Sequence, residues 1–410
     1  MLCASLLKQL VREGTLEVID ASGRTHRFAG APGIAVTIRL HDRKTEHRLL
    51  WNPRLAVGEA YMNGTLTIEH GTLYDFLDLM AINQEIGKAP LAMRAVDGLN
   101  YLWRRLAQSN DPSRARHNVA HHYDLSAKLY ELFLDADQQY SCAYFGRDGD
   151  DLERAQLRKK QHIARKLQLE PGQRVLDIGC GWGGLALSLA ASADVEVLGI
   201  TLSTEQQTVA TRRAAAAGLA DRVRFELLDY RDVSGSFDRI VSVGMFEHVG
   251  LPNYGRFFQQ IRTLLKPDGV ALLHSIGRAD GPGATNTWLR KYIFPGGYSP
   301  ALSEVMPAVE AARLFVTDIE ILRLHYARTL AAWRARFNAN RAAVAELYDE
   351  RFCRMWEFYL VGSELAFRRQ GHMVWQMQMA RDVGTVPQTR DYIYERSPET
   401  LAVVSNASAA

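Results

Sequence analysis

The chain has 410 residues, of which 47% are hydrophobic and 23% are charged, an ordinary globular composition. This length exceeds that of one typical domain, so we expect two domains. Because 49 Lys and Arg nearly balance 46 Asp and Glu, the net charge of +3 gives no reason to expect nucleic acid as a partner.

The cysteines and the apolar runs restrict the cellular setting. The four cysteines lie far apart and contain no CxxC pair, which argues against a structural zinc site or a disulfide framework. No stretch of about eighteen apolar residues occurs, as a membrane-spanning helix would need. We therefore expect a cytoplasmic protein that does not cross a membrane.

The N-terminal part of the chain is predicted to form a small α+β domain. Residues 5–12 predict a short helix, and residues 15–19 and 34–40 alternate apolar and polar side chains, as half-buried strands do. Helical patterns follow over residues 55–80. Residues 83–116 carry six Lys or Arg against three acids, which indicates a basic helical connector.

The pattern changes at Val175. The short apolar runs VLDIG, VEVLGIT, RIVSVG and VALLHSI are separated by segments of helical length. Repeated strand and helix in this order predicts an α/β fold, a parallel sheet with helices on both faces. Residues 315–322 and the run MVWQMQMAR (373–381) predict two further strands.

A glycine-rich loop follows the first of these runs. In VLDIGCGWGG, Gly179 and Gly181 stand where a tight turn lets backbone amides and the next helix face a ligand. The loop also satisfies GxGxxG, but a nicotinamide site needs an acid about twenty residues on, and Gly199 to Ser203 contain none. The DxGxGxG form beginning at Asp177 is the usual loop of Rossmann-like methyltransferases. The alternative is a glycine-rich turn without a ligand, but the strand-loop-helix context of the motif favours ligand binding.

Asp229 stands at the end of a later predicted strand, in LLDYRD. A carboxylate there can accept a hydrogen bond from an adenine amino group. It can equally cap the following helix. The sequence leaves both interpretations open.

Seven blocks in a fixed order carry a resemblance to a known family. They are HHYDLSAKLYELFLD (121–135), YSCAYF (140–145), LDIGCGWGG (176–184), GITLSTEQ (199–206), MFEHVG (245–250), HSIG (274–277) and HYARTLAAW (325–333). Together they resemble the cyclopropane-fatty-acyl-phospholipid synthases, a family that includes the mycolic acid cyclopropane synthases. The resemblance implies a Rossmann-like class I methyltransferase domain with a mostly parallel seven-stranded sheet, which we place at residues 116–400.

The N-terminal run LAVGEAYMNGTL (55–66) resembles the extra domain of the bacterial members that act on phospholipid. The resemblance implies a lipid-binding and dimerisation domain at residues 1–115, with the basic connector included. It further implies unsaturated phospholipid as the substrate, peripheral contact with the inner face of the membrane, and a homodimer.

The family motifs assign two groups of site residues and two small-molecule ligands. The residues implied for S-adenosylmethionine are Tyr140, Ser141, Asp177, Gly179, Gly181, Thr201, Leu202, Gln206 and Asp229. The residues implied for a catalytic bicarbonate ion are Cys142, Glu247, His274, Ile276 through its backbone, and Tyr326. No metal is implied, because no Cys or acid completes a ligand set with His117, His121 and His122.

The implied chemistry explains these residue types. A cis olefin attacks the electrophilic methyl without a base, and the resulting cation needs a dry site lined with aromatic faces. Candidate side chains are Tyr140, Tyr144, Phe145, Phe246, Tyr292, Phe294 and Tyr298. Ring closure then needs a base that the cation does not alkylate, and a small oxyanion held by side chains meets this demand.

Three other functions stay open at this stage. The adjacent Glu247 and His248 also suit amine methylation, in which a substrate nitrogen attacks. A different proton loss from the cation would give a methyl- or methylene-branched chain. A noncatalytic lipid-binding protein would be favoured by loss of Asp177, Glu247 or the glycine loop, and the sequence keeps all three.

Overall fold

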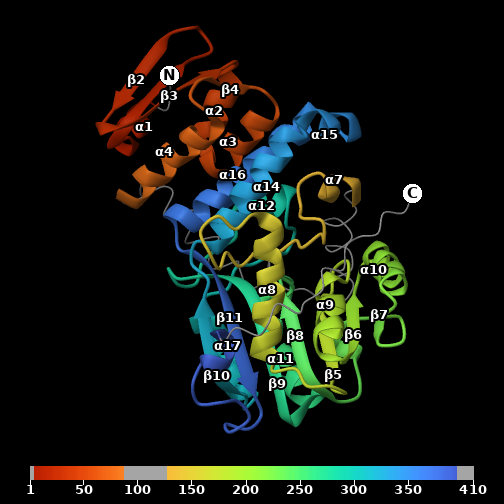
Figure 1. Cartoon of the computed structure of the whole chain (residues 1–410). Helices are drawn as coiled ribbons and strands as arrows, with labels where there is room; N and C mark the ends of the chain where they lie inside the picture. Colours follow the sequence, from red (N-terminus) through yellow and green to blue (C-terminus); the bar gives the residue numbers. More distant parts are fainter. Residues whose placement is uncertain (1–3, 87–126, 395–410) are drawn as a thin grey trace. The chain divides into compact units, whose positions relative to one another are not determined.

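The computed structural model describes residues 4–86 and 127–394, which divide into two compact units (Figure 1). Of these residues, the first unit contains 4–86 together with Ala284–Pro295 and Ala327–Gly371. The second unit contains 127–283, Gly296–Tyr326 and 372–394. The sequence predicted continuous domains with a boundary near residue 115, so the two later segments of the first unit are a departure from that prediction.

The first unit is built on a four-stranded sheet with the order β2-β1-β3-β4, in which β1 and β3 are parallel. Its strands are β1 (Glu13–Ile19), β2 (Thr25–Ala29), β3 (Ala31–Leu40) and β4 (Leu66–His70). Its N-terminal helices are α1 (Ala4–Leu10), α2 (Arg43–Trp51), α3 (Pro53–Met62) and α4 (Leu73–Ile86). Strand β4 lies inside the stretch 55–80 that was predicted to be helical. The chain turns at Gly64, whose φ is +69°, and β4 then pairs with β3.

Helices from late in the chain complete the core of the first unit. They are α12 (Thr287–Tyr292), most of α14 (His325–Ala339), α15 (Arg341–Leu347) and α16 (Glu350–Arg369). Val361 and Leu365 of α16 belong to the same buried cluster as Leu16 and Val36 of the sheet. The Arg369 guanidinium also donates to Asp78 of α4 at 2.8 Å. The apolar face of α16 thus covers the N-terminal core, although 250 or more residues separate the two in sequence.

The second unit contains the predicted seven-stranded sheet. Its order is β10-β11-β9-β8-β5-β6-β7, with β5 to β9 parallel to one another and with β11 antiparallel to both β9 and β10. The strands are β5 (Arg174–Ile178), β6 (Glu196–Thr201), β7 (Val223–Leu227), β8 (Phe237–Val243), β9 (Leu265–Arg278), β10 (Phe315–Ile321) and β11 (His372–Ala380). The predicted fold class and the two predicted C-terminal strands are confirmed.

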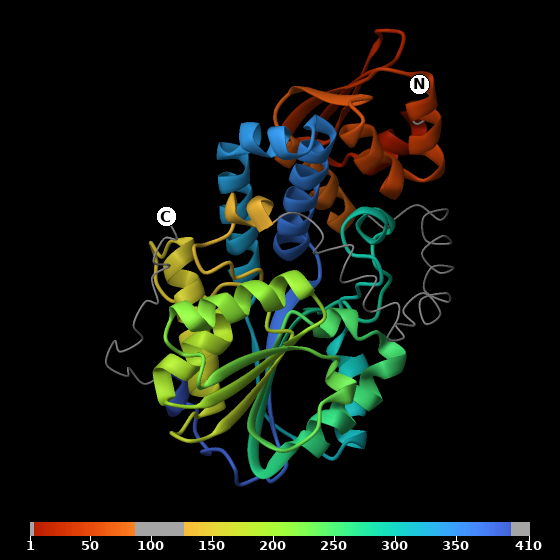
Figure 2. The ribbon, with the colours of Figure 1, turned by 90° about the vertical axis from the view of Figure 1, so that its right-hand side faces the viewer.

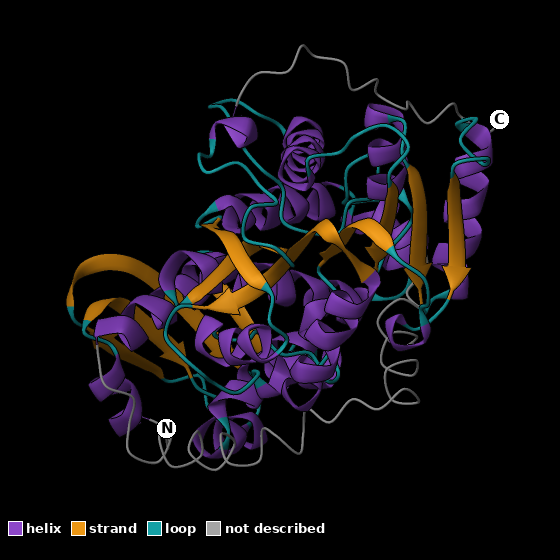
Figure 3. Ribbon diagram, turned by 90° about the horizontal axis from the view of Figure 1, so that it is seen from below, coloured by secondary structure: helices purple, strands orange, loops and turns teal. Residues whose placement is uncertain are grey.

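Helices cover both faces of this sheet (Figures 2 and 3). One face carries α8 (Leu152–Leu167), α9 (Gly184–Ala193) and α10 (Thr204–Ala216), and the other carries α11 (Tyr254–Leu264) and α13 (Leu302–Ala311). Adjacent residues of β9 divide between the two cores, since Leu272 packs with the α8 face and Leu273 with the α11 face. The shorter helices are α7 (Ala127–Glu131), η1 (Tyr230–Asp232), η2 (Phe246–His248), η3 (Leu251–Asn253) and α17 (Asp391–Tyr394).

The strand order indicates where a ligand-binding crevice should lie. From β5 the chain moves to β6 and β7 on one side and later to β8 and β9 on the other. In open parallel sheets, ligands bind outside the carboxyl ends of the strands at such a reversal. The glycine loop follows β5 and therefore lies at this position.

Candidate active site

The glycine loop joins β5 to α9 and uses backbone conformations that favour glycine. Gly179 has a φ of +84° and Gly181 a φ of +54°. A Cβ at Gly179 would come within 2.8 Å of the Met245 side chain, whereas a Cβ at Gly181 would meet nothing within 4 Å. The loop is thus closely packed at Gly179 and open at Gly181, which leaves space for a ligand.

A pocket opens at the carboxyl ends of β5, β6, β7 and β8. All nine residues that the motifs assigned to S-adenosylmethionine line it: Tyr140, Ser141, Asp177, Gly179, Gly181, Thr201, Leu202, Gln206 and Asp229. The structure therefore brings together, in one cavity, residues that the sequence spreads over about 90 positions.

Asp177 supplies a buried carboxylate to this pocket. Its Oδ2 atom has no hydrogen-bond partner among the described residues. Burial raises the pKa of Asp177 to about 7, and the positive charge of Lys159 opposes this rise. A buried acceptor of this kind suits a ligand that brings a hydrogen-bond donor or a positive charge.

For Asp229 the structure confirms the helix cap, and the adenine contact stays a prediction. Asp229 lines the pocket, and it also caps η1 by accepting from the Arg231 backbone at 3.0 Å. The Arg231 guanidinium donates to both of its carboxylate oxygens, at 2.8 and 2.6 Å. These two hydrogen bonds from Arg231 hold the Asp229 carboxylate in one orientation.

Glu247 lies in η2, just after the end of β8. Its Oε1 atom accepts from the Ile276 backbone at 2.6 Å, so the carboxylate continues the pairing with β9 beyond Val243 and His274. Its Oε2 atom is buried and has no partner within residues 4–86 and 127–394. Burial raises the pKa of Glu247 to about 7, against the effect of the Ile276 amide. The Ile276 amide was predicted to hold the ion, but in the structure it is already bound to Glu247.

His274 is buried on β9, two residues before Ile276. Its Nδ1 atom lies 3.1 Å from the Nε2 atom of Gln376, which is a donor. Nδ1 then accepts and the proton resides on Nε2. Burial, assisted by the charge of Lys159, lowers the pKa of His274 to about 3, which keeps the ring neutral. His274 therefore offers one N–H donor.

The chain segments that carry Cys142 and Tyr326 are joined by a hydrogen bond between neighbouring residues. Cys142 is 1% exposed, and its thiol contacts the Ala143 carbonyl at 3.4 Å. Tyr326 lies in the first turn of α14, and the preceding residue, His325, accepts from the Phe145 backbone at 3.0 Å. The start of α14 is thereby attached to the YSCAYF segment. The five residues assigned to bicarbonate are not among those that line the cofactor pocket.

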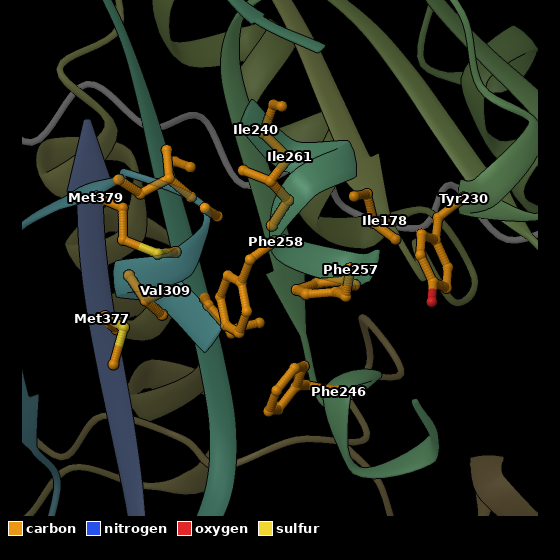
Figure 4. Close-up of a cluster of buried hydrophobic side chains, with 14 of the residues drawn as sticks. Ile178, Tyr230, Ile240, Phe246, Phe257, Phe258, Ile261, Val309, Met377 and Met379 are labelled. Carbon is orange, nitrogen blue, oxygen red and sulfur yellow. The ribbon is translucent and has the colours of Figure 1, made fainter. Parts of the chain in front are cut away.

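The aromatic candidates for cation shielding separate into different environments. Tyr140 lines the pocket, whereas Tyr292 and Phe294 belong to the first unit. Phe246 is fully buried in the α11 core, where it packs against Phe257 and Phe258 (Figure 4). The prediction that Phe246 faces the reacting chain is therefore wrong, because the first turn after β8 directs this ring into the core.

Several pocket residues were not found from the sequence. They include Gln138, Gln139, Trp182, Tyr230, Arg231 and Met245. Position alone gives a signal for Trp182, which lies within the glycine loop. His248, which the sequence named only for amine methylation, also lines the pocket. Burial lowers the pKa of His248 to about 4, so this ring is also neutral.

In the described part of the chain, no group of three or more His, Cys, Asp or Glu is placed to hold a metal ion. His117, His121 and His122 lie outside the described residues. Among the helices of the described ranges, none has the length and apolarity that crossing a membrane would require.

The sheet order, the glycine loop and the pocket at the strand reversal define a class I methyltransferase, an enzyme that depends on S-adenosylmethionine. Residues 110–377 match the family model described as mycolic acid cyclopropane synthetase. The chain belongs to this family.

Three similar proteins extend over much of the chain. The cyclopropane-fatty-acyl-phospholipid synthase of Escherichia coli K12 is 40% identical over 346 residues, 84% of this chain and 88% of that protein. The tuberculostearic acid methyltransferase UfaA1 of Mycobacterium tuberculosis is 36% identical over 341 residues, 80% of this chain and 79% of that protein. The crystal structure of mycolic acid cyclopropane synthase CmaA1 complexed with SAH and CTAB is 36% identical, with a TM-score of 0.61 over 64% of this chain and 97% of that chain.

Proposed function

We propose that this enzyme transfers the methyl group of S-adenosylmethionine to the cis double bond of unsaturated acyl chains in membrane phospholipid, forming a cyclopropane ring. The observation that carries the proposal is the buried, unpartnered Oε2 atom of Glu247 close to the cofactor pocket. Ring closure needs a base in a dry site, and this oxygen is an acceptor that can hold the hydroxyl of such a base.

The pocket fits the cofactor on its own chemistry. It offers an unpartnered carboxylate oxygen at Asp177, open space at Gly181, and a fixed carboxylate at Asp229. Asp177 suits the ammonium of the methionyl part, and Asp229 suits an adenine amino group. Bound S-adenosylmethionine supplies the methyl group as a sulfonium electrophile.

The residues beside the pocket fit a bicarbonate ion, which would supply the base. Glu247 accepts from the hydroxyl of the ion through Oε2, and His274 donates through Nε2. Tyr326 supplies a second donor, and Cys142 packs against the ion. Ile276 acts through Glu247, since its amide holds the carboxylate in place.

The choice of phospholipid rests on the extent of the match. The Escherichia coli synthase matches 84% of this chain, whereas the mycolic acid synthase structure covers 64%. A match to 84% of the chain must begin before residue 110, so it includes residues of the first unit. If the substrate lies in a bilayer, binding to that bilayer is a function that the first unit can serve.

A second product is favoured by one specific observation, the 36% identity to the tuberculostearic acid methyltransferase. In that case a methyl branch would replace the ring. Amine methylation receives less support, because Glu247 is turned toward β9 and only His248 of the pair lines the pocket.

Product analysis tests the proposal. The enzyme would be incubated with methyl-labelled S-adenosylmethionine and vesicles of unsaturated phospholipid, and the released acyl chains separated by chromatography. We expect label in a chain that has lost its double bond and gained one CH2 unit in a ring. Label in a branched chain would favour the second product, and label confined to headgroup amines would overturn the proposal.

Contact with an anionic membrane is part of the proposal, and the first unit offers a surface for it. We define the α2 patch as Arg43, Lys44, Leu50 and Trp51. Trp51 is 83% exposed and Leu50 is 40% exposed, and both cationic side chains are exposed. Tryptophan with flanking cations is the combination that settles at a bilayer surface.

The acids of the same helix region are engaged elsewhere. Asp42 accepts from the Thr45 backbone at 2.7 Å as the cap of α2. Glu46 is buried and accepts from the Ala21 backbone at 3.1 Å. The outward face of the α2 patch is therefore cationic and apolar, which complements anionic lipid.

Point variants are the appropriate test, because removal of residues 1–110 would uncover Val361 and Leu365 of α16. We expect Trp51→Ala to weaken sedimentation with phosphatidylglycerol vesicles. Val383→Ala is the matched control, since Val383 is 70% exposed in the second unit. Arg43→Gln with Lys44→Gln should reduce the salt-sensitive part of binding. Unchanged binding in all patch variants would contradict this surface.

We propose a homodimer that works in the cytoplasm on the inner face of the membrane, without nucleic acid as a partner. The measured mass of the full chain in solution tests the dimer, and a monomeric mass over the working concentration range would contradict it.

A further inference from the structure

One helix holds the segment that forms one wall of the cofactor pocket. We define the strap as residues 138–142, of which four line the pocket. Lys159 of α8 is fully buried, and its Nζ atom donates to Gln139 Oε1 and to Ser141 Oγ, both at 2.7 Å. Gln156, one turn earlier, donates to the Gln139 and Ser141 carbonyls, both at 3.0 Å. Residues three apart lie on one helix face, so both side chains reach the strap.

The hydrogen bonds of Lys159 have a fixed direction. An ammonium group only donates, so Ser141 Oγ and Gln139 Oε1 must accept from it. The hydroxyl proton of Ser141 is then left to donate to another group. Gln139 donates in turn through Nε2 to Asp137 Oδ2 at 3.1 Å. The Lys159 ammonium therefore fixes the direction of the hydrogen bonds at both Ser141 and Gln139.

The charged surroundings of Lys159 are mixed. Burial lowers the pKa of Lys159 to about 8, and the carboxylate of Asp135 opposes this change. Six titratable groups interact electrostatically with Lys159, and they come from the strap region, α8, β5 and β9. They are Asp135, Asp137, Cys142, Lys160, Asp177 and His274. The two hydrogen-bond acceptors of Lys159, on Gln139 and Ser141, are neutral, so the ammonium forms no ion pair with either of them.

We propose that Lys159 is a positioning residue that directs the Ser141 hydroxyl toward the methionyl carboxylate of S-adenosylmethionine and places a positive charge behind it. This inference rests on the proposed cofactor assignment of Ser141. The carboxylate is the one anionic group of the cofactor, and a hydroxyl donor backed by a buried cation is suited to it. Asp177, at the end of β5, remains for the ammonium of the same part of the ligand.

Two ligands separate this role from a merely structural one. S-adenosylhomocysteine has the amino-acid carboxylate, whereas methylthioadenosine has the same nucleoside without it. Lys159→Met keeps a long unbranched side chain but removes the charge and the donors. We expect this variant to bind S-adenosylhomocysteine about tenfold more weakly or worse in calorimetry, because a charge-assisted hydrogen bond is lost. Its affinity for methylthioadenosine should be unchanged.

Two further variants keep the test decisive. Gln156→Met removes the strap contacts without removing charge, and it should weaken both ligands alike. Ser141→Ala should reproduce the selective loss of affinity for S-adenosylhomocysteine. The double variant with Lys159→Met should lose little further affinity, because the two residues act as one unit. The preference of the parent enzyme for S-adenosylhomocysteine should shrink as pH rises through about 8. In Lys159→Met the change near pH 8 should be absent, whereas the part that comes from Asp177 should remain.

The outcomes distinguish the inference from the function on which it rests. Equal weakening of both ligands by Lys159→Met, or no weakening of either, would overturn the positioning role. Full additivity of the Lys159 and Ser141 variants would overturn it as well, and this comparison remains available through Lys159→Gln if Lys159→Met does not fold. Failure of the parent enzyme to bind either ligand would instead overturn the cofactor assignment.

Discussion

Glu247→Gln should make the protein more stable and nearly inactive at the same time. The substitution keeps the size of the side chain and an oxygen that can accept from the Ile276 amide, which the carboxylate now binds at 2.6 Å. It removes the second carboxylate oxygen, which is buried without a partner in the described structure. Burying the ionised Glu247 carboxylate therefore reduces the stability of the folded protein.

The magnitude follows from the pKa. Burial raises the pKa of Glu247 from 4.5 to about 7, which corresponds to about 3 kcal/mol against the ionised carboxylate. A raised folded-state pKa contributes stability that is fully present below the unfolded-state value and is lost as pH rises through the folded-state value. Glutamine does not titrate. The stability of Glu247→Gln relative to the parent should therefore increase by about 3 kcal/mol between about pH 4.5 and about pH 8.

Denaturant unfolding of both proteins at several pH values measures this difference. Changes in other titrating groups cancel in the comparison. Turnover of the variant should fall by about a hundredfold or more, the usual contribution of a general base, with affinity for S-adenosylhomocysteine unchanged. A stability difference that does not change with pH would refute the burial argument, and retained turnover would refute the catalytic role.

The remaining predictions address the pocket, the ion and the domain organisation. Gly181→Asp should abolish binding of S-adenosylhomocysteine in calorimetry, because it places charge and bulk in the open part of the loop; binding of NAD(H) by the parent, without any S-adenosylmethionine binding, would contradict the cofactor assignment. Tyr326→Phe should remove one charge-assisted hydrogen bond to the ion, about 1.5–3 kcal/mol, and turnover should partly return with added bicarbonate; a loss that is independent of bicarbonate would contradict that role. Leu365→Ala should destabilise the first unit by about 2–5 kcal/mol and expose residues 4–86 to proteolysis first, while unaltered cleavage there would show that α16 does not support this core.

Local sequence patterns predicted the second unit well. The runs VLDIG, VEVLGIT and RIVSVG are β-branched, apolar and separated by helical lengths, so β5, β6 and β8 follow from them. The glycine loop and the strand ends then fix the pocket, because parallel strands bring their carboxyl ends to one edge. The nine predicted cofactor residues therefore line one cavity.

Features that depend on tertiary packing were not predictable. The apolar face of α16 gives no sign of which core it covers, and its packing on the N-terminal sheet was missed. The sequence of α8, LERAQLRKKQHIARKL, suggests a solvated helix, yet Lys159 and Gln156 are buried because the strap covers them. Nor did the sequence indicate that the Ile276 amide binds Glu247, since this contact arises only where β8 ends and β9 continues.

We propose above all that methyl transfer to a double bond is followed by loss of one proton from the transferred carbon. Enzyme supplied with trideuteromethyl S-adenosylmethionine and unsaturated phospholipid vesicles tests it, with mass spectrometry of the acyl product. We expect a saturated chain whose added ring carbon carries two deuterium atoms, the third having passed to the base. An acyl product that retains all three deuterium atoms, or label found only on a headgroup nitrogen, would contradict it.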